Sequence, residues 1–160
     1  MPGIEGLSGV VTVTREGRPV STVTGGGCTP ASRFQIASIS KNFTSTLTMM
    51  LVEEGLLDLH ASLDRWLPEA PASWHGLTLH HVLSNSSGVG HWSEVPGLDQ
   101  SAPVTRDDRL ALVLRAPLQF EPGTQFCYSS PAFMAVAVVA ERTACMPYAE
   151  LLAEKILRSA

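Results

Sequence analysis

The 160-residue sequence lacks the features that would direct it to a membrane or to nucleic acid. Its eleven lysine and arginine residues are scattered through a chain of net charge -4, so there is no basic stripe and nucleic acid is not an expected partner. No apolar run reaches the ~18 residues that a membrane span needs. The most apolar stretch, residues 132–140, is predicted to be a buried helix. With 44% hydrophobic and 16% charged residues, the composition is that of an ordinary globular domain.

Cysteine is scarce, and a secretory signal is missing. The three cysteines, Cys28, Cys127 and Cys145, are an odd number without the spacing of a disulfide framework, which favours a reducing compartment or incidental core thiols. Residues 1–6 lack the basic start and long apolar core of a signal peptide. These features predict a cytoplasmic protein, or a secreted or periplasmic one if the start has been trimmed.

Metal-ligand and phosphate-loop patterns are missing too. His80, His81 and His91 have no carboxylate or histidine at ligand spacing, so no metal site is expected. The glycines at 25–27 lack the lysine and helix start of a phosphate loop, and they are interpreted as a hairpin-like turn between two strands. No cofactor is expected.

Lysine is much rarer than arginine in this sequence, and one of the lysines lies close to a serine. Only two lysines occur among the eleven basic residues, and Lys41 follows Ser38 by three positions. A guanidinium cannot lose its proton at ordinary pH, whereas an amine can. Residues i and i+3 share a helix face, so a helix that begins near Ser38 would place the amine beside the hydroxyl. The pair is a candidate nucleophile with its base.

Such a base works only if its surroundings lower the pKa of the amine from its ordinary value of ~10.4, which requires an apolar pocket. Apolar residues precede the pair and recur after it at the spacing of one buried helix face: Phe34 and Ile36, then Ile39, Phe43, Leu47, Met50 and Leu51. Alone, however, the spacing fits a helix N-cap serine and a solvated lysine equally well.

The hydrophobic pattern predicts an α+β protein. Strands are expected at 7–14, 19–24 and 33–36. A long helix over 38–54 should end at Gly55, and Thr105 should cap a later helix. Further helices are predicted at 62–66, 78–83, 106–114, 132–142 and 148–157, with an irregular loop at 91–103.

Four further blocks follow Ser38-Ile39-Ser40-Lys41 in a characteristic order. They are residues 51–59 (LVEEGLLDL), 64–68 (DRWLP), 77–88 (LTLHHVLSNSSG) and 122–130 (PGTQFCYSS). Their order and spacing resemble the serine β-lactamase and penicillin-binding protein family, specifically its branch of class C β-lactamases, D-alanyl-D-alanine carboxypeptidases and esterases. The resemblance extends from about the first predicted strand to the last residue.

The resemblance implies a serine acyl hydrolase that needs no metal or organic cofactor. Ser38 would be the acylated nucleophile, Lys41 would assist its deprotonation, and Tyr128 would relay protons. The family's Tyr-x-Asn motif reads Tyr128-Ser129-Ser130 here, so Ser130 takes the place of a substrate-binding amide. Without the family context, Tyr128 is better interpreted as a core-edge tyrosine with a backbone partner.

The expected substrate is a small ester, amide or β-lactam, and an acyltransferase of the same family is an alternative. A second alternative is a catalytically inactive fragment or subunit. A third is a structural interaction module in which the Ser-x-x-Lys spacing is accidental.

One part of the family pattern is missing. Its third motif, a Lys or His followed by any residue and Gly, should come after Tyr128, yet the last glycine is Gly123. In the family that strand supplies an oxyanion-hole donor, and removing one such donor costs on the order of 10²- to 10³-fold in rate.

The expected fold is therefore an incomplete β-lactamase/transpeptidase-like fold, the N-terminal part of a single domain. Strands would lie within about 7–36, the nucleophile helix at about 38–54 and a helical region at about 62–160. The missing C-terminal strands would leave unpaired edges, which predicts a C-terminal complementary polypeptide or self-association.

Overall fold

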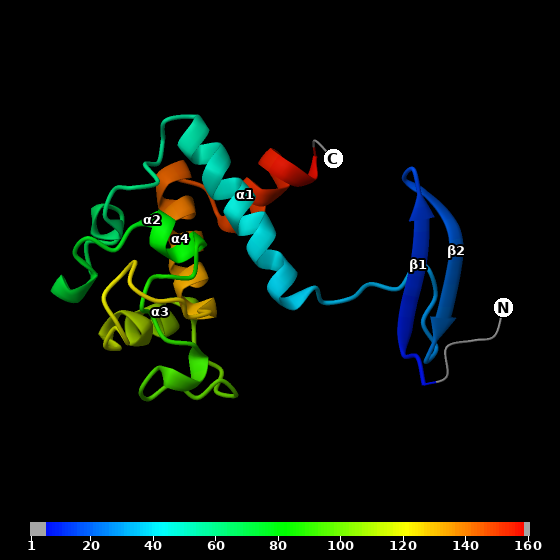
Figure 1. Cartoon of the computed structure of the whole chain (residues 1–160), viewed down its shortest axis with the longest axis horizontal. Coiled ribbons are helices and arrows are strands. Elements are labelled where there is room, and N and C mark those ends of the chain that lie inside the picture. Colours follow the sequence, from blue (N-terminus) through cyan, green and yellow to red (C-terminus); the bar gives the residue numbers. More distant parts are fainter. Residues whose placement is uncertain (1–5, 159–160) are drawn as a thin grey trace. The chain divides into compact units, whose positions relative to one another are not determined.

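The computed structural model describes residues 6–158, in two compact units, Met1–Ala37 and Ser38–Ala160 (Figure 1). The first unit is an antiparallel hairpin of β1 (Gly9–Arg15) and β2 (Arg18–Gly25). The two residues between the strands, Glu16 and Gly17, have φ angles of 50° and 74°, as a tight hairpin turn of matching twist requires. The first two predicted strands are therefore confirmed.

The predicted third strand, residues 33–36, is wrong. A turn does follow β2, where Cys28 N–H donates to Gly25 C=O at 3.2 Å, but residues 32–36 adopt no regular secondary structure. Among the described residues the sheet contains only β1 and β2. A short apolar run becomes a strand only when a neighbouring strand accepts and donates its backbone hydrogen bonds, and residues 33–36 have no such neighbour.

The second unit is helical. A 3₁₀ turn, η1 (Ala37–Ile39), leads into α1 (Ser40–Glu53), which ends before Gly55 at a φ of 72°, as predicted. The other α-helices are α2 (Leu79–Leu83), α3 (Arg106–Arg115), α4 (Ser130–Ala144) and α5 (Tyr148–Leu152). Short 3₁₀ turns are η2 (Leu63–Arg65), η3 (Ala72–Trp74) and η4 (Trp92–Glu94), and α5 continues into a π-helical turn, η5 (Ala153–Leu157).

These elements confirm the predicted helices with two changes. The helix expected at 62–66 is only a single 3₁₀ turn, and the one expected at 148–157 changes to π geometry after Leu152. The predicted loop at 91–103 is irregular apart from η4. None of the helices in residues 6–158 has the length and apolarity to cross a bilayer.

Helix α4 is the centre of the second unit. It contacts α1, α2, α3 and α5. Eight of its residues are buried, among them Phe133, Val136 and Val139, which confirms the predicted burial of the most apolar stretch. Trp74 and the leucines of α1 and the intervening turns complete the same core. Because α4 begins at Ser130, its position fixes the residues just before it relative to α1.

The buried face of α1 differs from the predicted one. Leu47 and Leu51 are fully buried, but Ile39 is 57% exposed. The remaining buried positions are threonines: Thr44 and Thr48 donate to the carbonyls of Ser40 and Thr44 at 3.2 and 2.8 Å. A threonine hydroxyl that donates to the carbonyl four residues earlier can be buried at little cost in free energy. A prediction from the apolar residues alone therefore assigns the wrong buried face to α1.

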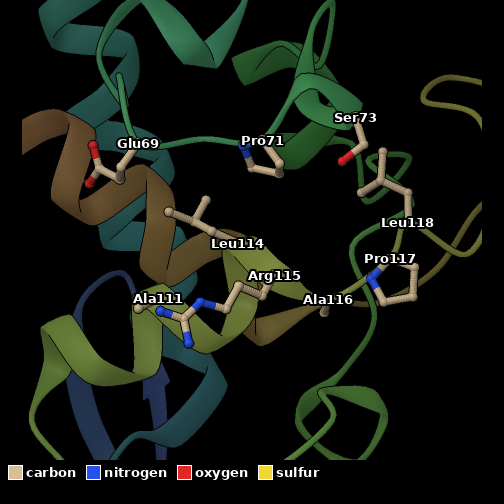
Figure 2. Close-up of a pocket in the computed structure, with 9 residues that line it drawn as sticks. All are labelled: Glu69, Pro71, Ser73, Ala111, Leu114, Arg115, Ala116, Pro117 and Leu118. Atoms are coloured by element: carbon tan, nitrogen blue, oxygen red, sulfur yellow. The ribbon is translucent and has the colours of Figure 1, made fainter.

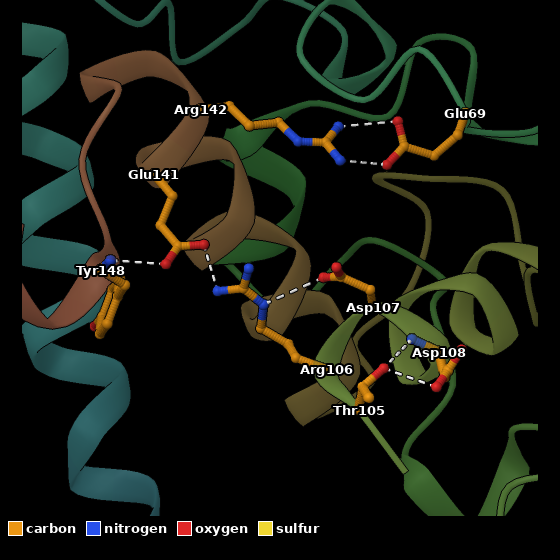
Figure 3. A network of polar contacts seen from close by, with 8 residues as sticks. All are labelled: Glu69, Thr105, Arg106, Asp107, Asp108, Glu141, Arg142 and Tyr148. Carbon is orange, nitrogen blue, oxygen red and sulfur yellow. Dashed lines mark hydrogen bonds and ion pairs between the residues drawn. The ribbon is translucent and has the colours of Figure 1, made fainter.

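Polar contacts connect α3, α4 and α5 (Figure 3). Thr105 caps α3 as predicted, since Asp108 N–H donates to its hydroxyl at 3.1 Å. Glu141 of α4 accepts from the Arg106 guanidinium and, at 2.7 Å, from Tyr148 N–H at the start of α5. Together these contacts join the start of α3 and the start of α5 to the C-terminal part of α4.

Candidate active site

Ser38 and Lys41 are neighbours in space, as the i, i+3 spacing predicts. Lys41 Nζ lies 3.3 Å from Ser38 Oγ, to which it donates. Ser38 occupies η1, and the preceding Ala37 has a left-handed φ of 44°, a conformation that costs free energy for a residue with a Cβ. The N-cap of α1 is Ile39, without a side-chain capping bond. The interpretation of Ser38 as a helix cap is therefore wrong, and its hydroxyl has other partners.

Tyr128 and Ser130 lie at the same place. The Tyr128 phenol donates to Ser38 Oγ at 2.6 Å, and Lys41 Nζ donates to Ser130 Oγ at 2.9 Å. The Tyr128 hydroxyl thus has a side-chain partner and not the backbone partner expected of a core-edge tyrosine. All four residues singled out in the sequence form one hydrogen-bonded cluster.

The backbone that carries Tyr128 and Ser130 is fixed by Ser129 between them. Ser129 is 1% exposed, and its hydroxyl accepts from Ala132 N–H at 3.1 Å as the N-cap of α4. The same hydroxyl donates to Gly90 C=O at 3.1 Å. The position of the Tyr128 backbone is therefore determined by α4 and by the segment at Gly90, which Ser129 connects.

Asn85 also holds this backbone, and sequence reasoning missed it. Its C=O accepts from Cys127 N–H at 2.8 Å and its Oδ1 from Ser129 N–H at 3.5 Å, so it contacts the residues on either side of Tyr128. Asn85 has a φ of 55°, a left-handed conformation in which asparagine is enriched. The sequence pointed to Asn85 only through its position in the block at 77–88. A sequence does not show which distant backbone groups an asparagine side chain contacts.

The electrostatics of the cluster favour ionisation of the phenol. Hydrogen bonds with Lys41 and then Ser38 lower the pKa of Tyr128 below its ordinary value, against the opposing effect of burial. Lys41 Nζ also lies 4.7 Å from the centroid of the Tyr128 ring and 5.7 Å from that of Phe133. The site therefore places the Lys41 amine beside a phenol whose pKa is lowered.

The apolar enclosure expected around Lys41 is only partial. Ser38 is exposed, Lys41 is half-buried, and Tyr128 is 39% exposed. Phe34 and Ile36, which were expected to form the dry pocket, are 52% and 45% exposed. Both belong to the first unit, so their part in enclosing Lys41 stays a prediction.

Other candidate residues have structural partners. His81 accepts from Thr78 N–H at 3.3 Å through Nδ1 and completes the capping box of α2, and burial lowers the pKa of its imidazole. Cys127 Sγ donates to Gln119 Oε1 at 3.3 Å, and burial raises the pKa of its thiol, which favours the unreactive protonated form. Within residues 6–158, no three His, Cys, Asp or Glu side chains are grouped as a metal site would need.

A cavity of about 610 Å³ lies apart from the cluster (Figure 2). It is formed by η3, the end of α3 and the segment after it. None of Ser38, Lys41, Tyr128 or Ser130 lines it; its lining residues are Glu69, Pro71, Ser73, Ala111, Leu114, Arg115, Ala116, Pro117 and Leu118. The nucleophile cluster therefore lies outside this cavity.

Residues 3–160 match the model of the protein family described as Beta-lactamase. Penicillin-binding protein 4* of Bacillus subtilis is 30% identical over 129 residues, which are 78% of this chain and 28% of that protein. Esterase EstB of Burkholderia gladioli is 32% identical over 132 residues, which are 72% of this chain and 33% of that protein. The chain thus spans about a third of the length of these relatives.

Solved structures that match this chain are also longer than it. A penicillin binding protein from Bacillus halodurans matches with a TM-score of 0.78 and 27% identity, over 95% of this chain and 51% of that one. EstCE1, described as a hydrolase with promiscuous acyltransferase activity, matches with a TM-score of 0.78 and 23% identity, over 94% of this chain and 45% of that one. The described arrangement of strands and helices corresponds to about half of each of these folds.

Proposed function

The chain belongs to the Beta-lactamase family and has the β-lactamase/transpeptidase-like fold, and on this premise we propose that it is a serine acyl hydrolase. The observation that carries the proposal is that one oxygen, Ser38 Oγ, accepts hydrogen bonds from both Tyr128 and Lys41, at 2.6 and 3.3 Å. A hydroxyl with two proton-handling groups within hydrogen-bond distance has the geometry of an activated nucleophile.

In the proposed reaction, Tyr128 first loses its proton to solvent, so that across the 2.6 Å contact Ser38 becomes the donor and the phenolate the acceptor. Ser38 Oγ then attacks the carbonyl carbon of an ester and its proton passes to the Tyr128 phenolate. The tetrahedral intermediate collapses, the C–O bond to the alcohol breaks, and the Tyr128 proton goes to the departing alkoxide. Water then attacks the acyl-enzyme, again giving a proton to Tyr128, and the acid is released as Ser38 regains a proton. No net proton or electron is left over.

Lys41 supports this reaction through its charge. Its hydrogen bond is the first cause of the lowered Tyr128 pKa, so it favours the phenolate that accepts the serine proton. It also donates to Ser130 Oγ, which keeps the amine between the phenol and the start of α4. Both contacts need a compact amine, because a planar guanidinium would present its donors in a fixed fork.

Ser130 sets the proposed substrate class. Its hydroxyl accepts from Lys41 and retains one proton that it can donate to a substrate oxygen. A carboxamide at this position would reach farther and offer both a donor and an acceptor to an amide substrate. We therefore assign small esters as the preferred substrates, with amides and β-lactams second. An acyltransferase would form the same acyl-enzyme and differ only in the molecule that accepts the acyl group. EstCE1 is described as having acyltransferase activity, so acyl transfer is the second proposed function.

The competing interpretation is an inactive fragment or subunit that needs a complementary polypeptide or self-association. It is supported by Ser130 in place of asparagine. Turnover by the isolated chain distinguishes the two interpretations.

The test is hydrolysis of short-chain aryl esters by the wild-type chain, Ser38→Ala and Ser40→Ala. Ser40 lies two residues away and contributes its backbone carbonyl to the Thr44 hydroxyl, so Ser40→Ala is a matched control. We expect turnover by wild type and Ser40→Ala, and only background hydrolysis by Ser38→Ala. Equal rates for wild type and Ser38→Ala, including no turnover by either folded chain, would overturn the proposal.

A further inference from the structure

His91, in the predicted irregular loop at 91–103, touches the proposed proton relay. Its imidazole stacks on the ring of Tyr128, with centroids 5.7 Å apart and an interplanar angle of 23°. Stacked aromatic rings restrict each other's rotation. Tyr128 is 39% exposed, and apart from this stacking its ring has Lys41 Nζ at 4.7 Å from the centroid.

Two hydrogen bonds fix the orientation of His91. Trp92 N–H donates to His91 Nδ1 at 2.8 Å, and His91 N–H donates to Glu94 Oε2 at 2.6 Å, a reciprocal cap of η4. A nitrogen that accepts cannot carry the proton, so the neutral ring is protonated at Nε2. The imidazole is thus held in one plane and one tautomer.

The backbone next to His91 is tied to the backbone next to Tyr128. Gly90 C=O accepts from the buried Ser129 hydroxyl at 3.1 Å. A side chain at Gly90 would be crowded, because a Cβ there would lie 3.0 Å from Glu94 Cβ and 3.1 Å from Gln119 Nε2. The hydrogen bond from His91 N–H is the largest cause that lowers the pKa of Glu94, and the hydrogen bond with Gln119 is the second. A lowered pKa favours the charged carboxylate, which is the form that accepts from His91 N–H.

We infer that His91 is a positioning residue for Tyr128: its fixed, neutral imidazole holds the phenol ring so that the hydroxyl stays on Ser38. The inference rests on the proposed role of Tyr128 in the acyl transfer. His91 has two separable features, a ring that stacks and a nitrogen that caps η4. Only the ring contacts Tyr128, so the two features predict different results for two substitutions.

The experiment compares His91→Asn with His91→Phe. Asparagine keeps an acceptor for Trp92 N–H but has no ring, whereas phenylalanine keeps a ring and has no acceptor. One readout is the rate of Ser38 acylation by an aryl ester. The other is the absorbance titration of the phenol, assigned by subtracting Tyr128→Phe, which is practical because the chain has two tyrosines.

We expect His91→Asn to slow acylation roughly three- to tenfold, the size of one aromatic contact, and to move the Tyr128 titration toward higher pH. His91→Phe should retain both properties. If His91→Asn behaves as wild type, or His91→Phe loses as much, the inference is overturned and His91 only caps η4. The titration needs no turnover: a shift in His91→Asn beside an inactive wild type would refute the hydrolase and support the positioning role.

Discussion

The Tyr128 phenol lies 2.6 Å from Ser38 Oγ although the two residues are 90 positions apart in the chain. Ser38 precedes α1, Tyr128 precedes α4, and the two helices pack against each other. The contact therefore depends on the same packing that buries Leu47, Leu51 and Val136. Stability of the helical unit and integrity of the site are expected to be coupled.

Replacement of Lys41 by arginine tests the need for an amine. A guanidinium keeps its charge but presents its donors in a fixed planar fork, so Lys41→Arg should disturb the interactions with Ser130 and Tyr128 and reduce Ser38 acylation by about 10²-fold or more. Lys155→Arg is the matched control, because the chain's other lysine forms an ion pair with Glu54, at 2.6 Å, that arginine can also form. Stopped-flow acylation with an aryl ester gives both rates. A Lys41→Arg rate close to that of Lys155→Arg would contradict the assigned role.

The lowered pKa of Tyr128 predicts how acylation depends on pH. The phenolate accepts the serine proton, so the rate should rise with pH as Tyr128 ionises and level off once it is ionised. Since hydrogen bonds with Lys41 and Ser38 lower this pKa, the rise should be centred below the ordinary tyrosine value of about 10. Tyr128→Phe should lose this rise and about 10²-fold or more in rate. An unchanged profile in Tyr128→Phe would show that another group carries the proton.

Ser130→Asn tests what determines substrate preference. The substitution restores the amide of the family motif, so hydrolysis of a chromogenic cephalosporin should increase relative to hydrolysis of an aryl ester. Ser130→Ala should instead slow both substrates, because Lys41 loses the acceptor at 2.9 Å. The informative quantity is the ratio of kcat/KM values for the two substrates. A ratio that Ser130→Asn leaves unchanged would mean that other residues set the preference.

A stability prediction concerns Glu141, which joins α3, α4 and α5 (Figure 3). Its side chain is 16% exposed, and Glu141→Ala would leave Tyr148 N–H without its acceptor and remove the ion pair with Arg106. The expected loss is about 1–3 kcal/mol in the free energy of unfolding. In Glu69→Ala, which removes a pair with Arg142 whose side chains are both 41% exposed, the loss should be about 0–1 kcal/mol. Urea unfolding of both variants measures the difference, and a larger loss in Glu69→Ala would contradict the account.

Local chemistry explains which parts of this structure the sequence predicts. Gly55 ends α1 and Thr105 begins α3, because a left-handed glycine and a capping hydroxyl act within a few residues of their positions. The spacing of Ser38 and Lys41 gives their contact directly from helix geometry. The pairing of these residues with Tyr128 could be expected only from the family resemblance, because it depends on tertiary packing.

The incorrect predictions share a cause. Residues 33–36 are apolar enough for a strand, but strands need a neighbour that a local pattern cannot identify. The buried face of α1 includes Thr44 and Thr48, whose hydroxyls are satisfied inside the helix and so escape an apolar count. Asn85 was missed because its role depends on its left-handed backbone and on the distant Cys127 and Ser129.

The most direct test of the central claim is where an acylating probe attaches. We would treat the folded chain with a fluorophosphonate, measure the intact mass, and locate the adduct by peptide mapping. A single adduct on Ser38 that is absent from Ser38→Ala is the predicted result. A folded chain that gains no adduct, or one that is labelled on a different serine while Ser38 stays free, would contradict the claim that Tyr128 and Lys41 make Ser38 a nucleophile.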